Sequence, residues 1–268
     1  MFSKPLFKQT LKSSYKIILI FMAVLTMYFV ILAGMYDPQQ ADKVQQMMKL
    51  MPKGWIDAMG YGSTPVPGLL GHLSTYFYGF LILFFPTIFD IILVNKLVSK
   101  HVDKGSMAYI LATPNTRKKI SVTFAGFILF SVTVLMAFVT ILGLIYCQMN
   151  FSGMLDVKKF ILINIGALLI HYAVSGIAFF ASCVFNDMKN SLGIGVGIPI
   201  AFLIIQMLAN MGGNLENFKY ATMFTLFNPS KIAVGDSSTL PCFIALAVIS
   251  GALFIGGIMI FNKKDLPI

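Results

Sequence analysis

The sequence predicts an all-α polytopic membrane protein, a single transmembrane domain of six helices over residues 1–268. Three observations predict this class. The chain is 57% hydrophobic and only 11% charged, whereas soluble domains carry about 25% charged residues. Its mean hydropathy is +0.83. Its apolar residues fall into blocks of about 20, the length that crosses a bilayer core of about 30 Å. These values exclude a soluble globular domain and a disordered chain.

The apolar blocks predict six spans, at residues 17–35, 76–98, 121–146, 160–185, 192–208 and 242–261. The segments expected on the same side of the membrane as the N-terminus hold 13 basic residues, and the segments expected on the opposite side hold 7. Because lysine and arginine are enriched in cytoplasmic loops, we expect both termini in the cytoplasm. Arg117 is the only arginine, which argues against recognition of nucleic acid.

The N-terminal segment predicts an amphipathic helix. Lysines recur every four residues, and apolar side chains recur one position earlier: Lys4, Lys8, Lys12 and Lys16, with Phe7, Leu11 and Tyr15. This pattern is typical of a helix that lies in the headgroup plane. A simple basic anchor at the inner leaflet is the alternative.

Two longer segments, 36–75 and 209–241, are expected outside the cell. Residues 41–51 predict a helix with one apolar face, formed by Val44, Met47, Met48 and Met51. Residues 218–227 are too few to span a bilayer, but they are apolar enough to lie at its surface or dip inward.

The segment between the second and third spans, residues 99–119, predicts a short cytoplasmic helix. Gly105 breaks the helix that leaves the membrane, and Ser106 can cap a new one. Pro114 ends it, and Asn115 or Thr116 caps the third span. The apolar turn between them contains Met107, Tyr109, Ile110 and Leu111. Apolar side chains presented to the cytoplasm indicate that this segment docks into a partner.

At these residues the chain resembles the permease subunits of type-2 ABC exporters. That family has six spans, cytoplasmic termini and a coupling helix between spans two and three that sits in a groove of the ATPase subunit. The family pattern of two acidic residues, a glycine turn, apolar residues and Pro-x-Ser-Arg is matched by Asp103, Gly105, Ser106, Met107, Ile110, Leu111, Pro114, Thr116 and Arg117. His101 replaces the usual glutamate. The C-terminal Phe261, Lys263, Lys264, Asp265 and Leu266 are similar to the family's common ending.

The resemblance implies an ATP-driven exporter in a bacterial cell membrane. Its partners would be two ABC ATPase subunits and a second permease copy or a related permease. ATP and magnesium would bind the ATPase, so this chain is expected to bind no cofactor and to be no enzyme itself. The implied ATPase-docking residues are His101, Asp103, Gly105, Ser106, Met107, Tyr109, Ile110, Leu111, Pro114 and Arg117.

The side-chain content favours an apolar cargo. The chain holds 25 phenylalanines and 17 methionines, and methionine adapts to varied shapes. We therefore expect export of a hydrophobic or amphipathic peptide or drug. The alternative for these residues is simple contact with lipid.

The sequence lacks the residue patterns that ATP binding, proteolysis or metal binding would require. The sequence contains no Gly-x-x-x-x-Gly-Lys-Ser/Thr phosphate loop. Gly193 and Gly197 instead predict close helix packing. His171 and Ser175 lie four residues apart, which favours a packing hydrogen bond over a protease site. The three cysteines are scattered among apolar residues and predict no metal site.

Asp90 is the one acidic residue within a span, and we expect it to pair with Lys12 or Lys16. A gating role in translocation is the alternative. Together with His171 it could also carry a coupling ion, as a stand-alone secondary transporter or channel would require. A non-transporting assembly subunit is a further alternative.

Overall fold

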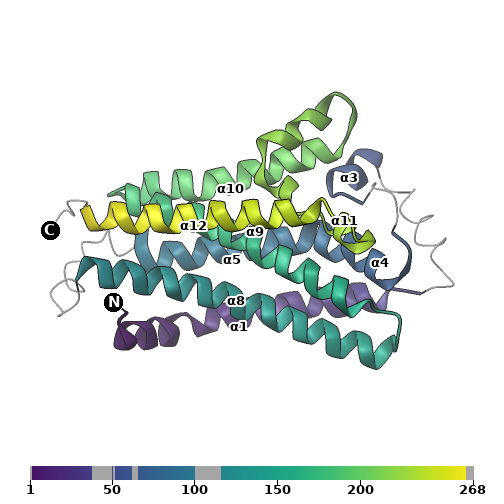
Figure 1. The fold of residues 1–268 in the computed structure, drawn as a ribbon, viewed down its shortest axis with the longest axis horizontal. Helices are drawn as coiled ribbons and strands as arrows, with labels where there is room; N and C mark the ends of the chain where they lie inside the picture. The colour runs from purple at the N-terminus through teal and green to yellow at the C-terminus, as the bar shows by residue number, and fades with distance from the viewer. Residues whose placement is uncertain (1, 38–49, 51, 62–65, 100–115, 264–268) are drawn as a thin grey trace.

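The computed structural model describes residues 2–37, 50, 52–61, 66–99 and 116–263. Every regular element in this part of the chain is a helix, and six of the helices are long and apolar enough to cross a membrane. The all-α class and the six predicted spans are therefore confirmed. Successive spans run in opposite directions along one bundle (Figure 1).

The second span is interrupted, whereas the others are continuous α-helices. It consists of α4 (Gly68–Tyr76), a π-helical turn (Phe77–Leu81), α5 (Ile82–Val94) and a second π-helical turn (Asn95–Ser99). The remaining spans are α1 (Lys4–Gly34), α8 (Arg117–Asn150), α9 (Val157–Val184), α10 (Met188–Asn210) and α12 (Thr239–Lys263). Between them lie α3 (Lys53–Ala58), α11 (Pro229–Val234) and two 3₁₀-helical stretches (Gly213–Ala221 and Met223–Leu226).

The second span begins at Gly68, well before the predicted start at residue 76. Its first turns contain polar side chains, which lowered their apparent hydropathy. These side chains are satisfied inside the bundle: Ser74 Oγ donates to the Leu70 carbonyl at 2.7 Å, and His72 Nε2 donates to the Leu32 carbonyl at 2.9 Å. A polar residue with an internal partner is compatible with a membrane helix.

The basic N-terminal segment and the first span form one unbroken helix, α1. Phe7 packs edge-on against Phe127 and Phe130 of α8, and the Ser3 amide donates to Thr123 Oγ1 at 3.0 Å. The four lysines of this segment stay exposed. Phe7 of the apolar row therefore packs on α8, whereas Tyr15 of the same row is exposed. The basic row remains available to lipid headgroups or solvent.

The N-termini of three spans are fixed by side-chain caps. Thr116, one of the two predicted caps, accepts from the Lys119 amide at 3.3 Å and begins α8. Asp156 accepts from the Lys159 amide at 3.1 Å and begins α9. Asp187 accepts from the Asn190 amide at 2.8 Å and begins α10. Each cap satisfies an amide that the helix itself leaves unpaired.

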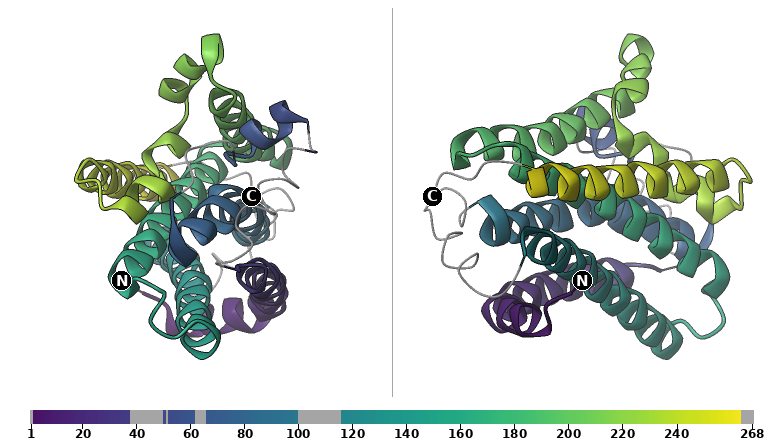
Figure 2. Two further views of the ribbon diagram at one scale, coloured as in Figure 1. Left: turned by 90° about the vertical axis from the view of Figure 1, so that its right-hand side faces the viewer. Right: turned by 60° about the vertical axis from the view of Figure 1, so that its left-hand side comes forward.

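The helix α9 forms the centre of the bundle and contacts α12, α10, α5 and α8. In the most apolar stretch of α9, 61% of the residues are buried, against 22% in α1, α10 and α12. In both orientations α10 and α12 lie on one side of α9 and α5, and α1 and α8 lie on the other (Figures 1 and 2). The peripheral spans thus leave most of these residues unburied by the rest of the chain.

The glycines predicted to mediate packing in α10 are the wrong ones. A Cβ atom on Gly193 or Gly197 would meet nothing within 4 Å. A Cβ atom on Gly195 would lie 3.3 Å from the Cα atom of Ala178 in α9. The buried face of α10 is therefore the one that holds Gly195, and the predicted pair faces outward.

The segment after α10 dips into the bundle at one end only. Phe218 and Tyr220 are exposed, whereas Met223, Phe224 and Phe227 are buried. The inward dip expected for residues 218–227 thus occurs in the second part of the segment, and a position at the membrane surface stays a prediction for the first part. The helix predicted over 41–51 lies outside the described residues.

Candidate functional site

The predicted docking segment lies almost entirely outside the described residues. This holds for His101, Asp103, Gly105, Ser106, Met107, Tyr109, Ile110, Leu111 and Pro114. Arg117 is described and forms the first residue of α8. The helices that flank the segment end and begin at the same end of the bundle as the start of α1 and the end of α12 (Figure 1).

Asp90 and His171 come together in the middle of the bundle. Asp90 lies on α5 and His171 on α9, both fully buried, and Asp90 Oδ2 is 3.0 Å from His171 Nδ1. The expected partners of Asp90 were Lys12 and Lys16, but both lysines are exposed on α1. That expectation is wrong because the depth of Asp90 places it against α9, beyond the basic end of α1.

The second nitrogen of His171 replaces a backbone hydrogen bond that α5 lacks at Pro86. A proline nitrogen carries no hydrogen, so Pro86 cannot donate to the Ile82 carbonyl four residues earlier. His171 Nε2 donates to this carbonyl at 2.7 Å. An unpaired carbonyl in the membrane interior is costly. The imidazole therefore holds the proline-interrupted helix to α9 through both of its nitrogens.

Two oxygen atoms beside the pair have no hydrogen-bond partner in the described part of the chain. These are Asp90 Oδ1 and Thr87 Oγ1, both on α5 and both buried. Buried polar atoms are usually paired, so such an exception indicates a functional or water-binding position. The site therefore offers two oxygen acceptors on its α5 side that pair with no described residue.

The Ser175 side chain forms no hydrogen bond with the side chains of Asp90 and His171. Its Oγ donates to the backbone carbonyls of His171, at 2.7 Å, and Tyr172, at 3.2 Å. The predicted packing hydrogen bond between the two side chains is therefore replaced by a bond within α9. Within the described ranges, no three His, Cys, Asp or Glu side chains gather in a way that could hold a metal ion.

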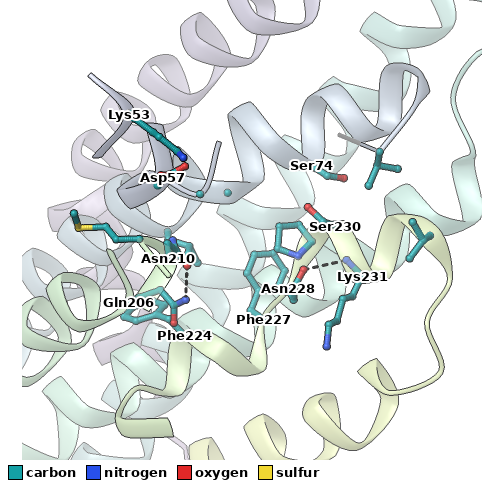
Figure 3. Close-up of a pocket in the computed structure, with 17 residues that line it drawn as sticks. Lys53, Asp57, Ser74, Gln206, Asn210, Phe224, Phe227, Asn228, Ser230 and Lys231 are labelled. Carbon is teal, nitrogen blue, oxygen red and sulfur yellow. Dashed lines mark hydrogen bonds between the residues drawn. The ribbon is translucent and has the colours of Figure 1, made fainter. Parts of the chain in front are cut away.

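A cleft of about 640 Å³ opens at the end of the bundle away from the two termini. Its walls come from α3, the second span, α10 and the segment that leads into α11 (Figure 3). Leu83, Phe224 and Phe227 are lining residues that are nearly fully buried. Lys53 and Lys231 are lining residues that are exposed. The cleft is thus apolar at its floor and basic at its rim.

A chain of amide hydrogen bonds fixes one wall of this cleft. Thr225 Oγ1 donates to Gln206 Oε1 at 2.9 Å, and Gln206 Nε2 donates to Asn210 Oδ1 at 2.9 Å. Asn210 Nδ2 then donates to the Ala58 carbonyl of α3 at 3.2 Å. The bonds join α3 to α10 across a long stretch of sequence, so the wall is built before any ligand arrives.

Sequence reasoning missed both the Asp90–His171 contact and the cleft. Pro86 was a usable signal for the first, because a proline in a span leaves a carbonyl that needs a donor from another helix. The cleft had no such signal, since its residues come from four separated stretches of sequence. Comparison with known proteins gives no match: no family model fits the chain, and no curated protein and no solved structure is similar to it.

Proposed function

We propose that this chain is the membrane-spanning permease subunit of an ATP-driven exporter. The cargo is a hydrophobic or amphipathic peptide or drug that leaves the cell. The six spans support a transport role. The observation that carries the proposal is the segment between the second and third spans, where residues 105–117 match the coupling pattern of type-2 exporters.

In this proposal the energy comes from another subunit. The sequence holds no phosphate-binding loop, so two ATPase subunits bind ATP and magnesium, and a second permease completes the assembly. ATP-driven closure of the ATPases moves the docked segment and changes how the two sets of spans meet. Coupling requires that the segment bind one ATPase conformation better than the other.

The test is co-purification with an ATPase, which we expect to be encoded beside this chain's gene. Replacement of Met107 and Leu111 by aspartate places charge in the docked turn and should abolish co-purification while membrane insertion stays intact. Met154→Asp is the matched control, because Met154 is exposed in the loop between α8 and α9. An ATPase that remains bound to the Met107→Asp/Leu111→Asp variant would contradict the docking role.

The Asp90–His171 pair favours a second candidate, a secondary transporter driven by a proton gradient. Ionisable residues inside a membrane are costly and mark proton or ion pathways. Here a carboxyl and an imidazole share one hydrogen bond at 3.0 Å in the middle of the bundle. The two candidates differ in energy source: the exporter needs nucleotide and a partner, and the secondary transporter needs neither.

A further inference from the structure

The cleft, at the end of the bundle away from the start of α1, has the size of a small-molecule site. Its volume of about 640 Å³ falls within the range of about 300–1,000 Å³ that is typical of ligand pockets. Its floor reaches down to Gly79, which lies within the π-helical turn of the second span, and to Leu83, just after that turn. Such turns inside α-helices occur frequently at functional sites.

The Gln206 and Asn210 side chains of the wall already form hydrogen bonds within the protein, whereas the lysines of the rim supply charged donors for a ligand. Gln206 and Asn210 form hydrogen bonds with Thr225, with each other and with the Ala58 carbonyl. Lys53 and Lys231 lie on opposite sides of the cleft (Figure 3). Neither ammonium group forms an ion pair with any described residue.

The charges at the rim are unequal in number. Among the described residues that line the cleft, Lys53 and Lys231 are cationic and Asp57 is anionic. Asp236 is the other carboxylate near Lys231, but it does not line the cleft. The pKa of Asp236 is lowered mainly by the Ser238 amide, which donates to its carboxylate at 2.9 Å. The described lining of the cleft therefore has an excess of positive charge over an apolar floor.

We propose that this cleft binds an amphiphile with an anionic headgroup, a phosphate or carboxylate held between Lys53 and Lys231, and an apolar part seated on Leu83, Phe224 and Phe227. Apolar surface removed from water supplies the binding energy, and the lysines select the sign of the headgroup. Binding does not depend on the proposed ATPase. If the exporter proposal holds, the cleft is a site where an amphipathic cargo rests on the outer side.

The test uses the full chain alone in nanodiscs of zwitterionic phosphatidylcholine. The probe is dodecyl phosphate with a photoactivatable diazirine at the end of its chain, and labelled peptides are located by mass spectrometry. We expect saturable labelling of residues 223–234, competed by unlabelled dodecyl phosphate and not by dodecyltrimethylammonium. Equal competition by the cationic amphiphile would overturn the proposal.

Charge reversal at the rim gives the sharper result. The double variant Lys53→Glu/Lys231→Glu should weaken labelling by about tenfold, as expected when two attractive contacts become repulsive. Lys158→Glu is the matched control, because Lys158 is an exposed lysine near the start of α9 that does not line the cleft. Unchanged labelling in the double variant would overturn the proposal.

A third variant tests the site without a change of charge. Ser230 lines the cleft, is half-buried and makes no side-chain hydrogen bond with a described residue. Ser230→Tyr should occlude the cleft and reduce labelling even if the double variant does not fold. Labelling that persists at full strength in Ser230→Tyr would contradict binding within the cleft.

Nanodiscs that contain anionic phosphatidylglycerol identify the source of the headgroup. Reduced labelling of the wild-type chain in these nanodiscs would show that a bilayer lipid occupies the cleft. Unchanged labelling would show that the ligand is a free amphiphile, as a cargo would be. Because no ATPase is present, a failure of binding leaves the docking proposal untouched, and loss of ATPase docking leaves this proposal untouched.

Discussion

His171 is the residue whose chemistry is most tightly defined by its surroundings. A carbonyl can only accept, so the contact with Ile82 requires a hydrogen on Nε2. The contact between Nδ1 and Asp90 Oδ2 then needs a proton on one of the two atoms. The pair is therefore either an imidazolium with a carboxylate or a neutral imidazole with a carboxylic acid. In both states it holds a single shared proton.

The first prediction follows from this hydrogen-bond pattern. Asp90→Asn should lower the free energy of unfolding by only about 1 kcal/mol, because the amide nitrogen can still donate to Nδ1 of a neutral imidazole. His171→Ala should cost about 3–5 kcal/mol, because it leaves a buried carboxyl group and the Ile82 carbonyl without partners. Unfolding of the purified chain in mixed micelles measures both values.

His72→Ala is the control for His171→Ala, since His72 also donates to a carbonyl but is only half-buried and makes one such bond. The structural role of His171 is refuted if its replacement costs no more than that of His72. An Asp90→Asn variant that is stable but inactive in transport would instead favour the proton-coupled candidate.

At the scale of elements, the second span is distinguished by Pro86, which lies inside α5. The proline removes one backbone bond, and α9 supplies the replacement through His171. Two π-helical turns, at Phe77–Leu81 and Asn95–Ser99, flank this region. The span therefore depends on α9 for part of its backbone pairing.

The second prediction is a coupling between Pro86 and His171. Pro86→Ala restores the amide hydrogen that the Ile82 carbonyl lacks, so loss of the imidazole becomes less harmful. We expect His171→Ala to cost about 1 kcal/mol less in the Pro86→Ala background than in the wild type. A double-mutant cycle of unfolding free energies measures this difference. Strictly additive effects would show that the two residues do not share the carbonyl.

The third prediction concerns the packing of α10 on α9. Gly195→Leu should separate the two helices and destabilise the chain, because even a Cβ atom there lies 3.3 Å from Ala178 Cα. Gly193→Leu should be nearly neutral, since that position is exposed and has open space around it. Thermal unfolding in detergent compares the two variants. Equal losses of stability would contradict the observed face of α10.

At the scale of the whole molecule, six spans with alternating directions place both termini and the start of α8 at one end. The distribution of lysine predicts that this end is cytoplasmic. The fourth prediction is that a cysteine at residue 106 reacts with a membrane-impermeant maleimide only in permeabilised cells. Cys242 is only partly buried, so it must be removed first. Labelling from outside intact cells would invert the topology.

The spans were predictable from sequence because hydropathy reports directly on burial in lipid. Their ends were less predictable, as at Gly68, because polar side chains such as Ser74 and His72 find partners inside the bundle. The partner of Asp90 and the packing face of α10 depend on how the helices are rotated. Rotation follows from the shape of the neighbouring helices, which no local pattern in the sequence describes.

In the function proposed above, a separate ATPase powers transport by this chain. The most direct measurement reconstitutes the purified chain in vesicles, alone and with its co-purified ATPase, and follows movement of a hydrophobic peptide. We predict movement only when the ATPase, ATP and magnesium are all present. Movement by the chain alone, driven by a proton gradient and indifferent to nucleotide, would contradict the account.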